Sequence, residues 1–419
     1  MEAAKAQKAS AGQEKLMKRN AVVSELRATS IETQANVKEY LEKAVADGKA
    51  KDIQSFYVVN GMAVTATKEV MEELARFPEI EKLLPNEVRQ LDPAAEAAAT
   101  TEIEVEEKPA AGLENIEWGV AQIGAPQAWE MGVDGQGTVV ASIDTGVQWD
   151  HPALMEKYRG YNGGSANHEY NWFDATPANQ STPYDDDGHG THVTGTMVGA
   201  EPNGSNQVGV APGAKWIGVK AFTPSGGTDV ALLAAGEWIL APKDASGTPN
   251  PAMAPDVVNN SWGGGPGLDE WYRPMVQAWV AADIFPAFAA GNTRIGNPGG
   301  PGSVSTPGNY PESFATGATD VNMNLASFSL QGPSPYDEIK PEVSAPGVGV
   351  RSSFPGNEYG AASGTSMASP HVAGVVALLK QVNSNLTVAD IEEILMTTAT
   401  ERTDSNFPDS PNNGYGHGI

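Results

Sequence analysis

Short runs rich in apolar residues recur along the chain from residue 138 onward, and each ends in small or polar residues. They cover residues 138–143, 216–220, 257–260 and 285–290. Strands without a polar face are typical of a parallel sheet that is covered on both sides. The stretch 230–240 between two of these runs has a helical pattern. This alternation predicts an α/β fold, a three-layer sandwich with a central, mostly parallel sheet.

The stretch 372–379 is apolar on every side of a predicted helix. A helix without a polar face belongs in the interior of a large fold. Ser366 precedes this stretch and follows Gly364 and Thr365, so it lies at the helix N-terminus. Free N–H groups and a partial positive charge at that end favour an oxyanion on or near the serine. From this stretch alone, Ser366 is either an ordinary serine near the N-cap of a core helix or a nucleophile.

The first part of the chain predicts a small α+β module. Residues 12–47 have helical apolar spacing, and β-rich runs on both sides of Asn60-Gly61 predict a hairpin. A short helix over 68–77 and a last strand over 80–88 complete the module, which we expect to hold one antiparallel sheet with helices on one face. A linker follows over 92–112, because few residues there can contribute to a core. Such a tethered module is a binding domain, a regulatory domain or a propeptide.

Composition narrows the function classes. The net charge of −26 over 419 residues argues against nucleic-acid binding. The chain has no cysteine, which excludes disulfides, a thiolate nucleophile and Cys-ligated zinc. No apolar run approaches the length of a bilayer span. The first residues, Met-Glu-Ala-Ala-Lys, lack the apolar core of a signal peptide, so we expect either a cytoplasmic protein or one whose signal is absent from this sequence.

Three further residues have chemistry that a serine nucleophile needs, although each has an ordinary interpretation by itself. Asp144 ends an apolar strand before Thr-Gly, His189 lies between two glycines, and Asn292 follows Ala-Ala-Gly at the end of a strand. Alone, each would be assigned to a turn or a structural role. His192 forms a His-x-x-His pair with His189, but no carboxylate at metalloprotease spacing accompanies them, so zinc is not expected.

Together these motifs resemble the subtilisin family of serine proteases. The resemblance rests on Asp-Thr-Gly at 144–146, Gly-His-Gly-Thr-His-Val at 188–193 and Gly-Thr-Ser-Met-Ala-Ser-Pro-His at 364–371. Ala-Ala-Gly-Asn at 289–292 is similar to the oxyanion block of that family, and Asn-Ser-Trp-Gly-Gly at 260–264 to its substrate-binding strand. Within the family, the stretches that begin at Asp134 and Ala254 look most like the bacillopeptidase F group.

The resemblance implies a serine endopeptidase that works through an acyl-enzyme. Ser366 would be the nucleophile, His189 the general base, Asp144 the residue that orients the histidine, and Asn292 an oxyanion donor. Extended substrate would lie between two strand edges, and a first specificity pocket without charged walls predicts broad or apolar preference. The implied substrate-binding residues are Ser225, Gly226, Gly227, Ser261, Trp262, Gly263, Ala289, Ala290 and Gly291.

The resemblance also implies a domain organisation. Residues 1–92 would be an inhibitory propeptide of the small ferredoxin-like type, which assists folding and acts as an intramolecular inhibitor. Residues 93–112 would be a linker that holds the processing site, and residues 113–419 the catalytic domain, truncated or processed at its C-terminus. We therefore expect a secreted, monomeric zymogen that acts on protein or peptide substrates, without nucleic-acid or membrane partners.

No cofactor is expected for the chemistry, whereas structural calcium is implied by the family. The loop 201–210 lies where the family has a calcium loop, but its residues differ, and Ala153 replaces the aspartate that would accompany it. Asp185–Asp187 offer hard oxygen donors elsewhere. The metal ligands are therefore not assigned. Two alternatives to the enzyme remain: a catalytically silent binding protein on the same fold, and a serine-carboxyl peptidase, which would carry carboxylates in place of His189 and Asn292.

Overall fold

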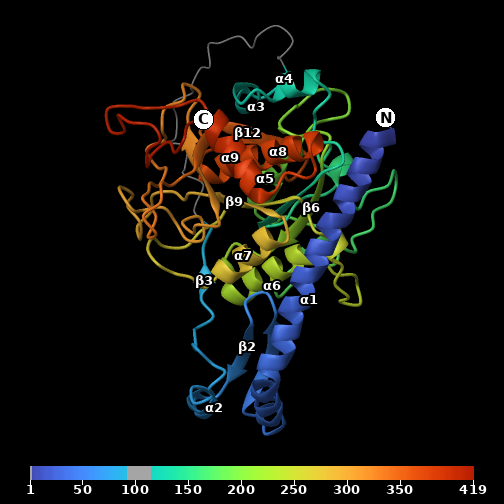
Figure 1. The fold of residues 1–419 in the computed structure, drawn as a ribbon, viewed down its shortest axis with the longest axis vertical. Coiled ribbons are helices and arrows are strands. Elements are labelled where there is room, and N and C mark those ends of the chain that lie inside the picture. Colours follow the sequence, from blue (N-terminus) through green and yellow to red (C-terminus); the bar gives the residue numbers. More distant parts are fainter. Residues whose placement is uncertain (1, 92–114) are drawn as a thin grey trace.

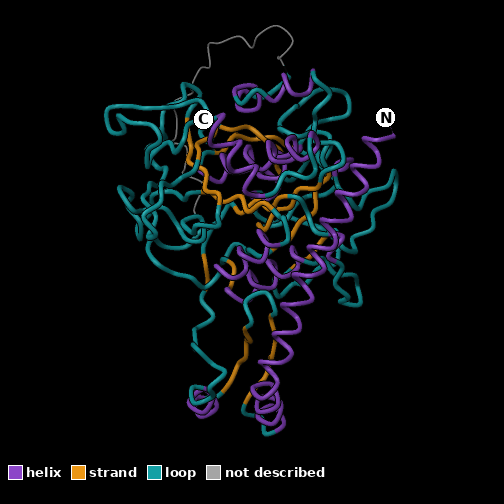
Figure 2. The backbone as a smooth tube through the Cα atoms, viewed as in Figure 1, coloured by secondary structure: helices purple, strands orange, loops and turns teal. Residues whose placement is uncertain are grey.

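The computed structural model describes residues 2–91 and 115–419, and side chains from residue 12 onward. The predicted linker lies outside these ranges. The larger part of the molecule is a parallel sheet of seven strands between two layers of helices (Figure 2). The strands, in their order across the sheet, are β11 (Val343–Pro346), β10 (Phe314–Thr319), β9 (Phe285–Ala289), β8 (Val257–Asn260), β4 (Val139–Asp144), β6 (Lys215–Lys220) and β5 (Trp172–Asp174).

The helices cover both faces of this sheet, which confirms the predicted α/β class (Figure 1). One hydrophobic cluster joins the sheet to α5 (His189–Val198), α8 (Thr365–Val382) and α9 (Val388–Thr398). A second cluster joins the opposite face to α6 (Asp229–Leu240) and α7 (Arg273–Ala281). Burial of the strands on both faces explains why their sequences lack a polar side.

The strand order reverses direction at β4. The chain adds β5 and β6 on one side of β4 and then β8 to β11 on the other. In open parallel sheets, the crevice beside such a reversal, at the carboxyl ends of the strands, is where functional groups gather. Asp144 ends β4, and Ser261 follows β8 directly. The topology therefore brings two of the residues singled out in the sequence to the same edge of the sheet, at the carboxyl ends of adjacent strands.

Short elements complete this part. They are α3 (Trp118–Gln122), α4 (Ala125–Glu130), the 3-10 helices at Met155–Lys157 and Pro251–Met253, and the hairpin of β12 (Val350–Phe354) and β13 (Glu358–Ala362). None of the helices among the described residues combines the length and apolarity that a membrane crossing needs.

The leading module consists of a long helix, a hairpin and a short helix. They are α1 (Glu2–Ala46), β1 (Ala50–Phe56), β2 (Gly61–Ala66) and α2 (Lys68–Leu74). The two strands pair in an antiparallel sheet, as predicted, and Asn60 adopts a positive φ of 46° in the turn between them. Val23, Phe56 and Val58 belong to the same hydrophobic cluster as α6 and α7, so this module packs on the α6–α7 layer.

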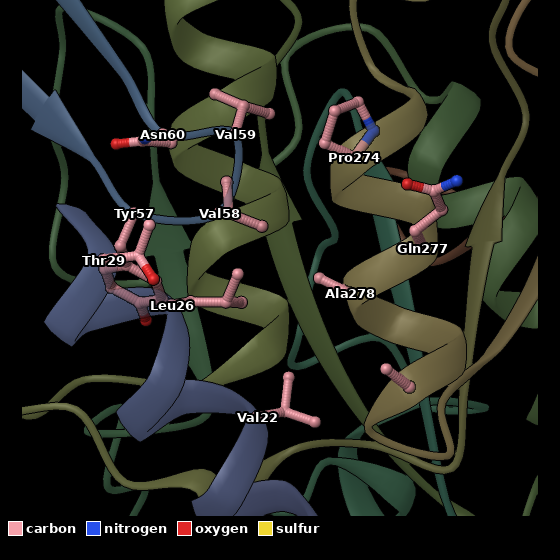
Figure 3. A pocket seen from close by; sticks show the side chains of 11 residues that line it. Val22, Leu26, Thr29, Tyr57, Val58, Val59, Asn60, Pro274, Gln277 and Ala278 are labelled. Atoms are coloured by element: carbon pink, nitrogen blue, oxygen red, sulfur yellow. The ribbon is translucent and has the colours of Figure 1, made fainter. Parts of the chain in front are cut away.

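The contact between the module and this layer is polar as well as apolar. A cavity of about 340 Å³ lies between α1, the hairpin turn and α7, and Figure 3 shows Val22, Leu26, Tyr57 and Ala278 around it. Beside it, the buried carboxylate of Glu237 on α6 accepts the backbone N–H of Tyr57 at 2.8 Å. The turn that links the two strands is therefore held by a helix of the larger domain.

The predicted last strand over residues 80–88 is wrong. Residues 80–87 have no regular structure, and the strand is instead β3, Val88–Arg89. It does not extend the hairpin but pairs in an antiparallel manner with β7, Gly227–Thr228, of the larger domain. Leu83 and Leu84 are exposed, so the apolar residues of this segment do not pack on a sheet as the predicted strand requires.

Candidate active site

The end of β4 and the start of α5 hold an Asp–His pair. Asp144 is the last residue of β4 and His189 is the first residue of α5. A side chain at Gly190 would place its Cβ 2.1 Å from the carbonyl oxygen of Gly146, so only glycine allows α5 to start this close to the end of β4. As a result, Nδ1 of His189 lies 2.7 Å from Oδ1 of Asp144, and both residues are buried.

This contact sets the protonation behaviour of the imidazole. Burial by itself would lower the pKa of His189, but the carboxylate of Asp144, with Asp187 and Asp185 farther away, raises the pKa above its ordinary value. Asp144 Oδ1 also accepts the backbone N–H of Thr145 at 2.7 Å, which fixes the carboxylate. Since Nδ1 faces this carboxylate, Nε2 is the nitrogen that remains for proton transfer.

Ser366 lies at the second residue of α8 and is buried. Its Oγ donates a hydrogen bond of 3.2 Å to the carbonyl oxygen of Ser261, whose own Oγ donates to the carbonyl oxygen of Ser366 at 2.8 Å. Nε2 of His189 has no hydrogen-bond partner within the described residues. The structure thus joins Asp144 to His189 and Ser366 to Ser261, without a hydrogen bond between Ser366 and His189.

Asn292 lies beside the turn that leads into α8. Its Oδ1 accepts the backbone N–H of Thr365 at 2.9 Å and the hydroxyl of Thr365 at 3.0 Å. These two donors fix which side of the amide is oxygen. Nδ2 consequently lies close to the backbone before Ser366: a Cβ built on Gly364 would be 3.3 Å from it.

The predicted substrate edge at Ser225–Gly227 is covered by the tail of the leading module. Arg89 pairs with Gly227 in the β3–β7 ladder, and Nε2 of Gln90 donates to the carbonyl oxygen of Ser225 at 3.1 Å. The tail therefore adds a strand to this edge, as an extended peptide substrate would. A Cβ on Gly226 would come within 2.6 Å of the carbonyl oxygen of Arg89, which explains the glycine at this point of close approach.

Comparison with known proteins decides the family. The sequence profile of the subtilase family matches residues 135–418. The chain is a subtilase. A second profile, that of peptidase inhibitor I9, matches residues 5–92 and thus covers the leading module of this subtilase.

Several curated relatives support this assignment. The subtilase is 62% identical to Bacillopeptidase F of Bacillus subtilis (strain 168) over 99% of the chain, but it spans only 29% of that relative's length. It is 34% identical to an Alkaline protease of Alkalihalobacillus alcalophilus, over 84% of this chain and 80% of that protein. It is 31% identical to Subtilisin E of Bacillus subtilis (strain 168), over 90% of this chain and 85% of that protein.

The residues expected to wall the first specificity pocket of the subtilase are buried in the full chain. Gly263 and Gly291 come from separate segments and both lie against Ser305. Trp262 is 2% exposed, and its ring packs against Phe222, Tyr272 and Phe288 in the core. The ring of Trp262 therefore belongs to this aromatic cluster, which leaves its backbone for the expected role as a pocket wall.

Sequence reasoning missed Ser305, which lies between the two expected walls. A Cβ built on Gly263 would be 3.0 Å from Cβ of Ser305, and one built on Gly291 would be 2.4 Å from its Oγ. This hydroxyl is buried and has no hydrogen-bond partner among the described residues. No local motif marks Ser305, because its position depends on packing between three segments that are far apart in the chain.

The second histidine of the His-x-x-His pair has a structural setting. Nε2 of His192 lies 2.9 Å from the carbonyl oxygen of Val350 and 3.1 Å from that of Gly360. Burial lowers the pKa of His192 to about 3, so the side chain is neutral and its Nε2 is the protonated nitrogen. A protonated ring nitrogen that donates hydrogen bonds to carbonyl oxygens has no lone pair with which to ligate a metal.

The oxygens considered for calcium are held by donors of the chain. Asp185 accepts the N–H and hydroxyl groups of Thr191 at 2.9 and 2.6 Å, and Asp186 pairs with Lys220 at 2.6 Å. In the loop 201–210, Arg351 donates to Oδ1 of Asn206 at 2.7 Å. Within residues 2–91 and 115–419, no three acidic or histidine side chains gather as metal ligands. Structural calcium has no support at these two stretches and stays a prediction.

Proposed function

We propose that this subtilase is a serine endopeptidase, synthesised as a zymogen that processes itself. The observation that carries the proposal is the buried hydrogen bond of 2.7 Å between Asp144 and His189 at the topological reversal of the sheet. It leaves Nε2 of the imidazole for proton transfer at the edge of the sheet where the first turn of α8 holds Ser366. The comparisons support this assignment, since the chain carries a subtilase domain behind an I9 inhibitor module.

In the proposed reaction, Oγ of Ser366 attacks the scissile carbonyl carbon while Nε2 of His189 takes its proton. His189 then returns this proton to the leaving amine, and an acyl-enzyme on Ser366 remains. The Asp144 carboxylate holds the tautomer with Nδ1–H and stabilises the imidazolium. Before attack, the Ser366 side chain turns from the Ser261 carbonyl toward His189; such contacts often form only in the complex with substrate.

The developing oxyanion is bound by Nδ2 of Asn292 and by the backbone N–H of Ser366 at the start of α8. The fixed orientation of the Asn292 amide supports this role, because Thr365 donates twice to Oδ1. Loss of one side-chain donor of this kind raises the barrier by about 2.7–4 kcal/mol, a figure that comes from a subtilisin. Secretion, a monomeric state and action on protein or peptide substrates complete the proposal.

The test is hydrolysis of a protein substrate such as casein by the processed chain and by two variants. We expect Ser366→Ala to abolish turnover and the wild-type chain to lose activity stoichiometrically with a serine-directed phosphonate. Ser369→Ala is the matched control, because its hydroxyl is buried on the same helix but bonds Asn259 at 2.7 Å. A Ser366→Ala protein that turns over casein at the wild-type rate would contradict the proposal; a silent binding protein would show no turnover in any form.

A further inference from the structure

The tail strand that covers the substrate edge ends in a buried ion pair. Nε of Arg89 lies 2.8 Å from Oδ1 of Asp229, and Nη2 of Arg89 lies 3.5 Å from Oδ2 of the same carboxylate. The Arg89 side chain is 19% exposed and that of Asp229 only 4%. Two parallel donors on one carboxylate form the geometry that distinguishes arginine from lysine.

Asp229 belongs to the catalytic domain and is prepared for this role. It lies in the first turn of α6, where the helix dipole favours a negative charge, and the hydroxyl of Tyr272 donates to its Oδ1. A second carboxylate, that of Asp269, lies 3.7 Å from the NH2 group of Arg89 and is 45% exposed. We call Asp229, Asp269 and Tyr272 the acidic subsite.

The same carboxylate also contacts the tail backbone. The N–H of Glu87 donates to Oδ2 of Asp229 at 3.0 Å, and the N–H of Asp229 donates to the carbonyl oxygen of Glu87 at 3.0 Å. These backbone contacts do not depend on the tail's sequence, so any extended peptide on the β7 edge can make them. Only the contact with the guanidinium of Arg89 depends on the identity of a side chain in the tail.

When the tail leaves, the carboxylate of Asp229 loses the guanidinium that neutralised it. The Tyr272 hydroxyl and the first turn of α6 still hold the carboxylate in place, and a new cation from the next extended peptide restores the pair. We propose that the acidic subsite is a specificity site of the mature enzyme, which selects substrates with arginine at the position that Arg89 occupies. This inference rests on the proposed function and names a substrate class for it.

The register places this position upstream of the scissile bond. Arg89, Gln90 and Leu91 all precede the predicted processing segment, so the selected residue lies at least three positions before the bond that is cut. The order of preference among substrates follows from the geometry of the side chains. Arginine can donate two hydrogen bonds to the Asp229 carboxylate, lysine can donate one, and glutamine carries no positive charge.

The experiment uses the self-processed wild-type enzyme and quenched peptides of one sequence. Arginine, lysine or glutamine replaces each of the five residues before the cut in turn, and mass spectrometry verifies the cut site. We expect kcat/KM to be about tenfold higher for arginine than for glutamine at a single position, the third, fourth or fifth before the cut. Lysine should give an intermediate value at that position. Equal rates at every position would overturn the inference, whereas no hydrolysis of any peptide would contradict the proposed function itself.

Variants assign the preference to the subsite. Asp229→Asn should remove most of the arginine-to-glutamine preference, and Asp269→Asn should reduce it less, because its carboxylate is farther from the guanidinium. Glu130→Gln, which removes an equal charge from the exposed end of α4, should leave the ratio unchanged. An unchanged ratio in Asp229→Asn would overturn the assignment.

A further variant covers the case in which Asp229→Asn does not fold. Arg89→Gln in the otherwise native full chain removes the same ion pair from the tail side. The tail should then inhibit less strongly, and peptide hydrolysis should appear sooner after self-processing than in the wild-type chain. Hydrolysis that appears at the wild-type rate would count against the subsite.

Discussion

At the scale of single residues, protonation of His189 controls the proposed reaction. The general base must be neutral to accept the Ser366 proton, so activity is lost as pH falls through the pKa of His189. Asp144 raises that pKa above its ordinary value near 6.5. The acid limb of kcat/KM should therefore lie above that of a free imidazole. A pH profile of peptide hydrolysis by the mature enzyme measures it.

Removal of the Asp144 charge should lower both the pKa of His189 and kcat. Asp144→Asn deletes the main cause that raises the pKa of His189, while burial continues to lower it. The acid limb should move to lower pH, and kcat should fall on the order of 10⁴-fold because the imidazole loses its tautomer. Asp150→Asn, an exposed acid in the following loop, is the control. An acid limb that stays in place in Asp144→Asn would refute His189 as the titrating base.

Ser305 offers a test of pocket size. Ser305→Gly removes a buried hydroxyl without a partner in the described part of the chain and opens space between Gly263 and Gly291. We expect the kcat/KM ratio of phenylalanine over alanine before the scissile bond to rise severalfold, since each buried methylene contributes about 0.8 kcal/mol.

The matched control for Ser305→Gly is Ser303→Gly. The Ser303 hydroxyl accepts the N–H of Gln331 at 2.9 Å and lies two residues before Ser305. Ser303→Gly should lower the free energy of unfolding but leave the phenylalanine-to-alanine ratio of kcat/KM unchanged. If both variants shift the ratio equally, Ser305 does not form part of the pocket.

At the scale of elements, the first part of α1 attaches the leading module to the larger domain. We define residues 12–28 of this helix as the N-terminal arm, which runs along the larger domain (Figure 1). Arg19 is 5% exposed and donates to the carbonyl oxygens of Ala254 at 2.8 Å, Ala282 at 3.2 Å and Pro255. Lys15 pairs with Asp256, which also accepts the N–H of Val139.

The arm should open more often without this guanidinium. Arg19→Ala in the Ser366→Ala full chain leaves several carbonyl oxygens short of a donor, at a cost of about 1–3 kcal/mol. A glutamate-specific protease should therefore cut at the exposed Glu14 or Glu25 roughly five- to a hundredfold faster, since cleavage follows the open population.

The charge-conserving change Arg19→Lys separates shape from charge at this site. Lysine has no planar fork and reaches fewer carbonyl oxygens, so the cleavage rate should lie between those of the parent and Arg19→Ala. Equal cleavage in all three proteins would show that the arm is not held by Arg19.

The sequence predicts the structure wherever a local pattern determines it. The buried strands, the helix after Ser366 and the Asn60-Gly61 hairpin follow from periodicity and turn chemistry. The motifs around Asp144, His189, Asn292 and Ser366 are short, so they can be recognised without knowledge of the fold. Arg19, Arg89, Asp229 and Ser305 were not singled out. The role of each depends on a partner more than a hundred residues away in the chain or on packing between distant segments. Such long-range contacts produce no local pattern in the sequence. The same reason explains the error over 80–88, whose strand partner lies in another domain.

At the scale of the whole molecule, one chain contains a subtilase domain and the peptide that covers its predicted substrate edge. The hairpin turn is bound to Glu237, the arm to the loop around Asp256, and the β3 tail to β7. The last of these contacts pairs the tail with the strand edge at which an extended substrate is expected to bind. The full chain should therefore be inhibited until the connection between the two parts is cut.

The most direct test of this account is the intact mass of the full chain over time after refolding. The wild-type chain should divide into two fragments with the cut between residues 92 and 114, and peptide hydrolysis should follow as the leading fragment is degraded. Ser366→Ala should keep its full mass under the same conditions. A Ser366→Ala chain that divides at the same bond and rate without any added protease would contradict the account, as would a wild-type chain that stays whole and hydrolyses no peptide.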